Sequence, residues 1–192
     1  REPANDVAFS AIEELHEKND DHQGLVDLFL NRVQTLSEPE LKVGLLIRVA
    51  RLRLDALGDV EGAIGTFHGI LDLAPKDVGV LRTCGDLHYD RQEYEDAARC
   101  YRALVPELSD SAKVGLLQYR LGVIFSEHIP DAQRAINALS IACRSFGPQA
   151  EEYVDGGRRL ARVYKATDKI DDARLVLSQL AQSATKVEDQ LE

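Results

Sequence analysis

The chain has 192 residues, of which 44% are hydrophobic and 29% charged, and its formal net charge is −10. It contains no run of 18 apolar residues and no basic-then-apolar leader, so we expect neither membrane insertion nor a signal peptide. The negative charge argues against nucleic-acid binding, because contacts to phosphates require a positive field.

The cysteines predict the cellular compartment of the chain, and its first residue bears on whether it is a fragment. Cys84, Cys100 and Cys143 are an odd number of widely spaced cysteines on predicted helices. We expect them to be buried free thiols in a reducing compartment, which predicts a cytoplasmic location. Because the chain starts at Arg1 and contains no methionine, we also expect it to be a fragment of a longer protein.

The first helical pattern covers approximately residues 6–39 and is weak. Its apolar members are Ile12, Leu25, Phe29 and Val33.

Residues 44–77 carry the clearest pattern of two helices. Apolar residues recur at helical spacing from Leu45 to Leu54, and Gly58 and Asp59 then interrupt the run. A second helical run follows and should end before Pro75, because proline cannot continue a helix. This segment is therefore predicted to form a helix-turn-helix pair.

The same pattern recurs along the rest of the chain, in units of approximately 78–111, 115–149 and 154–187. The residues that carry it in successive units are Ala63, Phe67 and Ile70; Ala97, Tyr101 and Leu104; Ala135, Leu139 and Ala142; and Ala173, Leu177 and Leu180. A period of about 34 residues built from two amphipathic helices is typical of a helical solenoid, in which each unit buries its apolar face against its neighbours.

These residues resemble the tetratricopeptide repeat (TPR) family, whose pattern also includes small residues such as Gly85, Gly122 and Ala161 in the first helix. The resemblance covers nearly the whole chain and is weakest in unit 6–39, where Leu25 stands in place of an alanine. It implies an all-α, right-handed superhelical solenoid of about five TPR-like units, which form a single domain over residues 1–192. It also implies a protein-interaction module, a scaffold or adaptor, and not an enzyme.

In this family the first helix of each pair lines a concave groove, and several basic residues fall on groove positions here. The predicted ligand-binding residues are Arg48, Arg82, Tyr119, Arg120, Arg158, Arg162 and Lys165. Because arginine forms forked hydrogen bonds with carboxylates, we expect an acidic peptide or an acidic protein surface as the partner. The family analogy adds a small GTPase as a folded partner. Alternatively, these arginines pair with neighbouring acids, which contributes little to stability.

A second surface feature favours a different class of function. Gly62, Gly65 and Gly69 lie on one outward stripe of a predicted second helix, where each glycine costs about 1 kcal/mol relative to alanine. A partner backbone packed closely against this stripe would offset that cost, but tolerated drift on a helix held by its neighbours is the favoured explanation. With the segment 186–192, where a next helix would begin, this stripe supports an alternative: a structural element that stacks through its convex or end surfaces and self-associates.

The sequence carries no motif for catalysis, a metal or a cofactor. Its five histidines share no metal-binding spacing with one another or with the cysteines. HExxH, CxxC, GxSxG and GxxxxGK[ST] are also missing. We therefore predict no catalytic residue, no metal site and no cofactor.

Overall fold

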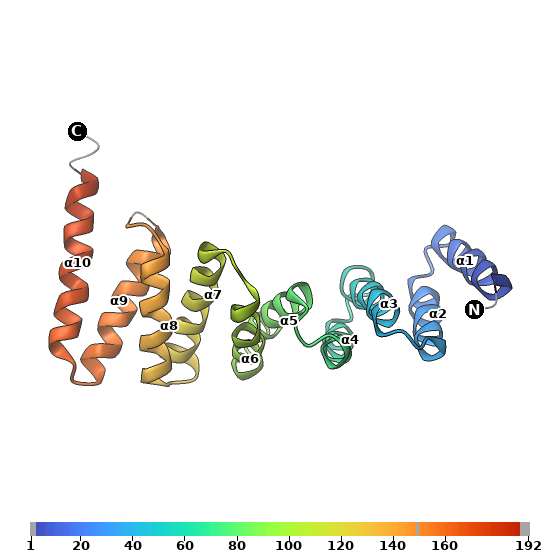
Figure 1. The fold of residues 1–192 in the computed structure, drawn as a ribbon, viewed down its shortest axis with the longest axis horizontal. Helices are drawn as coiled ribbons and strands as arrows, with labels where there is room; N and C mark the ends of the chain where they lie inside the picture. The colour runs from blue at the N-terminus through green and yellow to red at the C-terminus, as the bar shows by residue number, and fades with distance from the viewer. Residues whose placement is uncertain (1–2, 149, 189–192) are drawn as a thin grey trace. The chain divides into compact units, whose positions relative to one another are not determined.

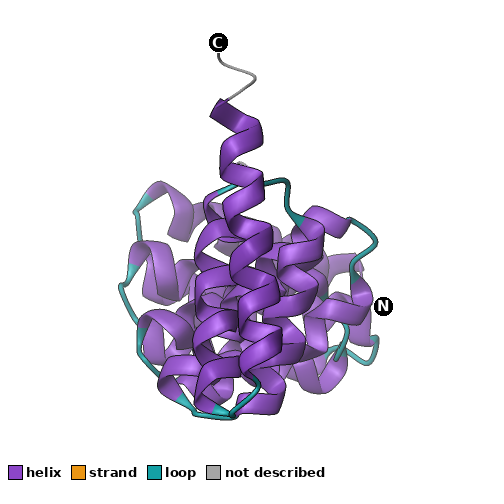
Figure 2. Ribbon diagram, turned by 90° about the vertical axis from the view of Figure 1, so that its left-hand side faces the viewer, coloured by secondary structure: helices purple, strands orange, loops and turns teal. Residues whose placement is uncertain are grey.

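The protein is represented by a computed structural model that describes residues 3–148 and 150–188. Within these residues the chain consists of α-helices, short helical segments and loops, without a strand (Figures 1 and 2). The α-helices are α1 (Pro3–Lys18), α2 (His22–Thr35), α3 (Pro39–Arg51), α4 (Val60–Leu73), α5 (Val78–Asp90), α6 (Tyr94–Leu104), α7 (Ser111–Val123), α8 (Ala132–Ser145), α9 (Glu151–Ala166) and α10 (Ile170–Glu188). Two π-helical segments, η1 (Leu52–Ala56) and η3 (Ile124–His128), extend α3 and α7, and a 3-10 turn, η2 (Val105–Glu107), follows α6.

The helices group into two compact units that meet within α5. The first unit runs to Leu87 and the second begins at His88. In the first unit α3 packs against α2 and α4. In the second, α8 packs against both α7 and α9, and α10 packs against α9. The packings of α3 with α4, α7 with α8 and α9 with α10 join the two helices of a predicted pair, whereas those of α2 with α3 and α8 with α9 stack one pair on the next.

Four of the turns between paired helices contain a residue in the left-handed conformation. These residues are Asp20, Gly58, Gln92 and Asp168, with φ of 53°, 65°, 62° and 59°. A left-handed residue just after a helix reverses the chain within a few residues. After two of these turns the following helix begins at an aspartate cap: the Asp21 and Asp59 carboxylates accept hydrogen bonds from the Gly24 and Gly62 amides, each at 2.9 Å.

In the three central pairs the repeat positions identified in the sequence form the core, whereas Leu177 of the last pair is half exposed. Phe67, Tyr101 and Leu139 are at most 5% exposed, and the alanines four residues before each of them are fully buried. Helix α4 ends at Leu73, two residues before Pro75, because proline terminates the run as predicted. The alanine and the large residue four positions after it thus occupy the same buried place in each of these helices.

Two expectations need correction. The residues of segment 186–192 that the structure describes, 186–188, continue α10 and do not begin a new helix; residues 189–192 lie outside the described part. Cys84 and Cys100 are buried free thiols as predicted, but Cys143 is only partly buried. Cys143 is partly accessible because it lines a cavity between α8, α9 and α10.

Gly122 permits the close contact between α7 and α8. A Cβ atom at this position would lie 2.5 Å from the Cδ2 atom and 2.6 Å from the Cγ atom of Leu139, a completely buried side chain. Glycine is therefore required here by packing, in the repeat position where the TPR pattern has a small residue.

We expect Gly122→Ala to lower the free energy of unfolding by about 1–3 kcal/mol, because the added methyl overpacks a closed contact. The matched control is Gly65→Ala in α4, where a Cβ atom would meet nothing within 4 Å. That change should raise stability by about 0.5–1 kcal/mol through helix propensity alone. Chemical denaturation of both variants tests the pair, and an equal response at the two sites would contradict the packing role of Gly122.

Candidate functional site

A row of basic side chains on α9 is the clearest candidate site in the second unit. Arg158, Arg162 and Lys165 are separated by four and three residues, so they lie on one face of the helix, and all three are exposed. None of them makes a hydrogen bond or ion pair with another residue of the described chain. We call Arg158, Arg162 and Lys165 the basic stripe.

A hydrogen-bonded network connects α9 to α7 beside this stripe. The Tyr119 hydroxyl of α7 donates to the Asp155 Oδ2 atom of α9 at 2.6 Å. Asp155 also accepts a bond from the Arg159 Nε atom, and the Arg159 Nη1 atom pairs with Glu127 of η3. The network fixes the position of Tyr119 relative to α9, so the predicted residue Tyr119 lies next to the helix that carries the basic stripe.

The charges in this network are defined by the surroundings of each group. Partial burial alone would raise the pKa of Asp155, but hydrogen bonds from Tyr119 and Arg159 outweigh it and lower that pKa. Burial and the neighbouring Asp155 carboxylate raise the pKa of Tyr119 to about 12. At neutral pH Asp155 is therefore an anion, and Tyr119 is a neutral hydrogen-bond donor.

Arg159 was not among the sequence-predicted site residues. It follows Arg158 directly in the chain, yet it is paired with two acids while Arg158 is unpaired. The spacing of four residues between Asp155 and Arg159 is the signal that could have identified this ion pair.

In the first unit, Arg48 of α3 is already paired with acids of α1. Its guanidinium contacts Glu13, lies 3.7 Å from a Glu17 carboxylate oxygen, and sits 4.2 Å from the centroid of the Phe29 ring. Arg48 is 44% exposed and borders a pocket of about 260 Å³. For this arginine the structure matches the alternative interpretation, in which neighbouring acids compensate its charge.

The two remaining predicted arginines differ from each other. Arg82 of α5 is half-buried and makes no hydrogen bond or ion pair with the described residues. Arg120 of α7 donates a hydrogen bond to the buried Tyr101 hydroxyl at 3.1 Å and lies 5.7 Å from that ring. Arg120 thus forms a hydrogen bond with a core residue of the second unit.

The three glycines that the sequence places on one face of α4, Gly62, Gly65 and Gly69, lie in two different environments. Gly62 is the third residue of the helix, and a Cβ atom there would collide with the Asp59 carboxylate that caps it. Gly65 and Gly69 have open space at the Cβ position. The cap accounts for Gly62, and only Gly65 and Gly69 offer a smooth surface to a partner.

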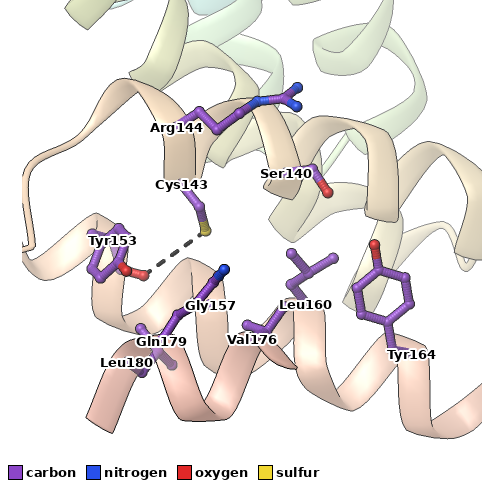
Figure 3. A pocket seen from close by; sticks show the side chains of 10 residues that line it. All are labelled: Ser140, Cys143, Arg144, Tyr153, Gly157, Leu160, Tyr164, Val176, Gln179 and Leu180. Carbon is purple, nitrogen blue, oxygen red and sulfur yellow. Dashed lines mark hydrogen bonds between the residues drawn. The ribbon is translucent and has the colours of Figure 1, made fainter. Parts of the chain in front are cut away.

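A cavity of about 350 Å³ lies between α8, α9 and α10 (Figure 3). Figure 3 shows Cys143 directed at the Tyr153 backbone, with a distance of 3.9 Å between the Cys143 Sγ atom and the Tyr153 carbonyl oxygen. Leu160 and Tyr164 of α9 also line it. Burial raises the pKa of the Cys143 thiol, which keeps it protonated and unreactive at neutral pH. Sequence reasoning did not find this cavity.

Comparisons with known proteins identify the fold. No protein-family model matches the chain, and no curated protein matches it in sequence. Solved structures do match in fold. MamA aligns with a TM-score of 0.59 and 12% identity over 95% of this chain and 93% of that chain. BtubC (BKLC) from P. vanneervenii aligns with a TM-score of 0.54 and 20% identity over 94% and 80% of the two chains.

A third similar structure is described as containing TPR-like repeats. The putative kinesin light chain from Podosopora anserina, with nearly identical TPR-like repeats, aligns with a TM-score of 0.54 and 15% identity over 97% of this chain and 98% of that one. At these identities the likeness concerns the fold alone. The chain has a TPR-like helical repeat fold, as its sequence pattern predicts.

No helix of the described segments is both long enough and apolar enough to cross a bilayer.

The Tyr119 hydrogen bond predicts a dependence of stability on alkaline pH. A pKa raised from about 10 to about 12 in the folded state means that the folded chain holds this proton more tightly than the unfolded chain. The resulting stabilisation is complete below pH 10 and is lost as the pH rises towards 12. Wild type should therefore lose more stability than Tyr119→Phe between pH 8 and 11 in urea titrations. Parallel losses in the two proteins would contradict the assigned hydrogen bond.

Proposed function

We propose that this chain is a protein-interaction scaffold whose second unit binds an acidic peptide or an acidic protein surface. The contact is made by the basic stripe of α9, with Tyr119 of α7 beside it. The observation that carries the proposal is the presence of three exposed, unpaired cations on one helix face in a chain of net charge −10. Among the described residues none of the three forms an ion pair with an acid, although Arg162 is close enough to help lower the pKa of Asp155.

The chemistry of the stripe suits carboxylate groups. Arginine presents a planar fork that binds both oxygens of a carboxylate, whereas lysine acts as a point charge. Arg158 and Arg162 are one helical turn apart, about 6 Å along the axis, which is close to the spacing of side chains two residues apart in an extended peptide. The proposed ligand therefore places acidic side chains along α9 in an extended conformation.

A purely structural role for part of the stripe is the competing explanation. Cations in the last turn of a helix are stabilised by the negative end of the helix dipole, typically by 0.3–1 kcal/mol, and Lys165 lies in the last turn of α9. Arg158 lies in the middle of the helix, where the dipole contributes little. Arg158 is accordingly the residue that best distinguishes ligand binding from helix stabilisation.

The scaffold assignment also draws on the fold. Helical repeats present extended concave surfaces to partners. The proposed contact is confined to the second unit, where Arg120 contributes less because it donates a hydrogen bond to the Tyr101 hydroxyl. Arg48, which is paired with Glu13, and Arg82 belong to the first unit and are not part of this contact. The comparisons give no support to a small GTPase, and it is not part of the proposal.

The double charge reversal Arg158→Glu with Arg162→Glu should weaken binding of a labelled hexaglutamate peptide by about tenfold or more. Each charge-assisted hydrogen bond contributes roughly 1.5–3 kcal/mol when it is shielded from water, and less when exposed. Fluorescence anisotropy at low ionic strength measures the change, and binding to wild type should weaken as salt is added.

The control has the same change in net charge at a different place. Arg99 and Arg102 are exposed arginines of α6 in the same unit, so Arg99→Glu with Arg102→Glu should leave most of the affinity intact. Equal losses in the two double variants would show that the peptide responds only to net charge, and the proposed site would then be rejected.

A further inference from the structure

One type of groove occurs twice in the second unit, each time between two second helices and the first helix of the later pair. The earlier groove is bordered by α6, α7 and α8 and has a volume of about 290 Å³. The later one is the cavity of about 350 Å³ between α8, α9 and α10. We call them the α7 groove and the α9 groove. The α7 groove is open although α9 and α10 follow it in the chain, so a following pair of helices does not close a groove of this type.

The two grooves are lined from equivalent positions of the repeat. Leu121 lines the α7 groove and Leu160 lines the α9 groove, and these two leucines are 3% and 4% exposed. Four residues after each leucine stands an aromatic residue, Phe125 in the first case and Tyr164 in the second, and it lines the same groove as its leucine. An interaction made in one groove therefore indicates what the other can accommodate.

In the α7 groove the chain supplies a guanidinium group of its own. Arg134 of α8 lines this groove, and its guanidinium carbon lies over the Phe125 ring, 5.5 Å from the ring centroid. A cation in this position is attracted to the face of the ring. The Arg134 Nε atom also lies 3.3 Å from the Oδ2 atom of Asp131, which compensates its charge. The α7 groove thus holds an arginine side chain that is stacked on an aromatic ring and paired with an acid.

The α9 groove has the aromatic ring but no such arginine. Asp172 takes the place of Arg134, because each of them directly precedes the alanine of the repeat pattern, Ala173 or Ala135. Asp172 is exposed and forms no ion pair within residues 3–148 and 150–188. Tyr164 is only partly buried. At this position the charge is therefore reversed, and the face of the ring lacks the cation that the preceding repeat provides.

Two hydroxyl groups of the α9 groove are also without a partner among the described residues. Ser140 of α8 and Tyr164 of α9 line the groove, and Figure 3 shows both hydroxyls pointing into it. Neither side chain forms a hydrogen bond with another described residue. Arg144 borders the same cavity, but its guanidinium points away from the other lining side chains (Figure 3). The groove accordingly offers an aromatic face and two hydroxyl oxygens that can accept hydrogen bonds.

We propose that the α9 groove binds the guanidinium group of an arginine side chain from a partner protein, in the place that Arg134 takes in the α7 groove. The guanidinium stacks on the Tyr164 ring, donates hydrogen bonds to the hydroxyls of Ser140 and Tyr164, and pairs with the Asp172 carboxylate. Arginine suits this groove better than lysine, because its planar cation stacks on aromatic rings and presents five hydrogen-bond donors.

This site is distinct from the basic stripe, although α9 contributes to both. Tyr164 follows Arg162 by two residues, which corresponds to about 200° around the helix. An arginine in the α9 groove and an acidic ligand on the basic stripe therefore use opposite sides of α9. The inference goes beyond the proposed function and does not depend on it.

Two acetylated and amidated peptides, Gly-Gly-Arg-Gly-Gly and Gly-Gly-Lys-Gly-Gly, test the recognition by NMR titration at low ionic strength. Each peptide carries one positive charge, so a difference between them reports on the guanidinium and not on net charge. The arginine peptide should bind wild type at least threefold more tightly than the lysine peptide. Tyr164→Leu should lower affinity for the arginine peptide at least threefold, whereas Tyr164→Phe, which keeps the ring, should retain most of it. Equal affinities of the two peptides for wild type would overturn the proposal.

Substitutions of two neighbouring exposed acids give a test that leaves the core untouched. Asp171 and Asp172 both lie in the first turn of α10, where the helix dipole stabilises a carboxylate, but Asp171 is paired with Arg174 at 3.5 Å. Asp172→Asn should lower affinity for the arginine peptide about threefold, and Asp171→Asn should leave it nearly unchanged. Equal losses in these two variants would show a response to net charge alone and would reject the site.

Asp172→Arg provides the strongest measurement, because it restores the arrangement of the α7 groove. The new guanidinium should stack on Tyr164, as Arg134 stacks on Phe125, and abolish binding of the arginine peptide. Binding that persists in this variant would contradict the proposal. Hexaglutamate binding by the basic stripe should not fall in any of these variants, which separates this test from that of the proposed function.

Discussion

Burial of one apolar stripe per helix against a neighbouring helix is the constraint on which the other features depend. A single amphipathic helix of 11 to 19 residues, as found here, gains little stability in isolation, and its stability comes from tertiary packing. In the second unit this packing depends on pairs of small and large residues. Gly122 of α7 accommodates Leu139 of α8, and Gly157 of α9 accommodates Leu180 of α10. The distance between helices is set by these pairs.

The same packing separates residues that bind within the chain from residues that remain available to a ligand. Arg158 and Arg159 are adjacent in sequence but point about 100° apart around α9. Arg159 is directed to Asp155 and Glu127, and Arg158 is directed to solvent. The Tyr119 hydrogen bond to Asp155 then holds α7 beside α9. An acidic chain can in this way keep a basic surface, because its acids are occupied at other positions on the helices.

Repetition also explains why apolar side chains are exposed on α1 and α10. Residues at internal stacking positions are apolar because a neighbour covers them, as Leu139 and Leu160 show. The pattern continues into the first and last helices of the described chain, where the same positions hold Ile12, Leu15 and Leu177 without a covering helix.

The helical pairs and their repeat could be predicted from sequence, because they depend on local periodicity and on residues with strong conformational preferences. The spacing of Ala63 and Phe67 predicted which faces are buried, and Pro75 predicted the end of α4. The existence of basic residues on first helices was equally visible in the sequence. Only tertiary structure decided which of these arginines form ion pairs, since Arg48 contacts Glu13, 35 residues away in sequence, whereas Arg158 forms no ion pair within residues 3–148 and 150–188. The cavity beside Cys143 and the exposure of Leu177 were also decided by tertiary structure, because both depend on which helices pack together and such contacts leave no local mark in the sequence.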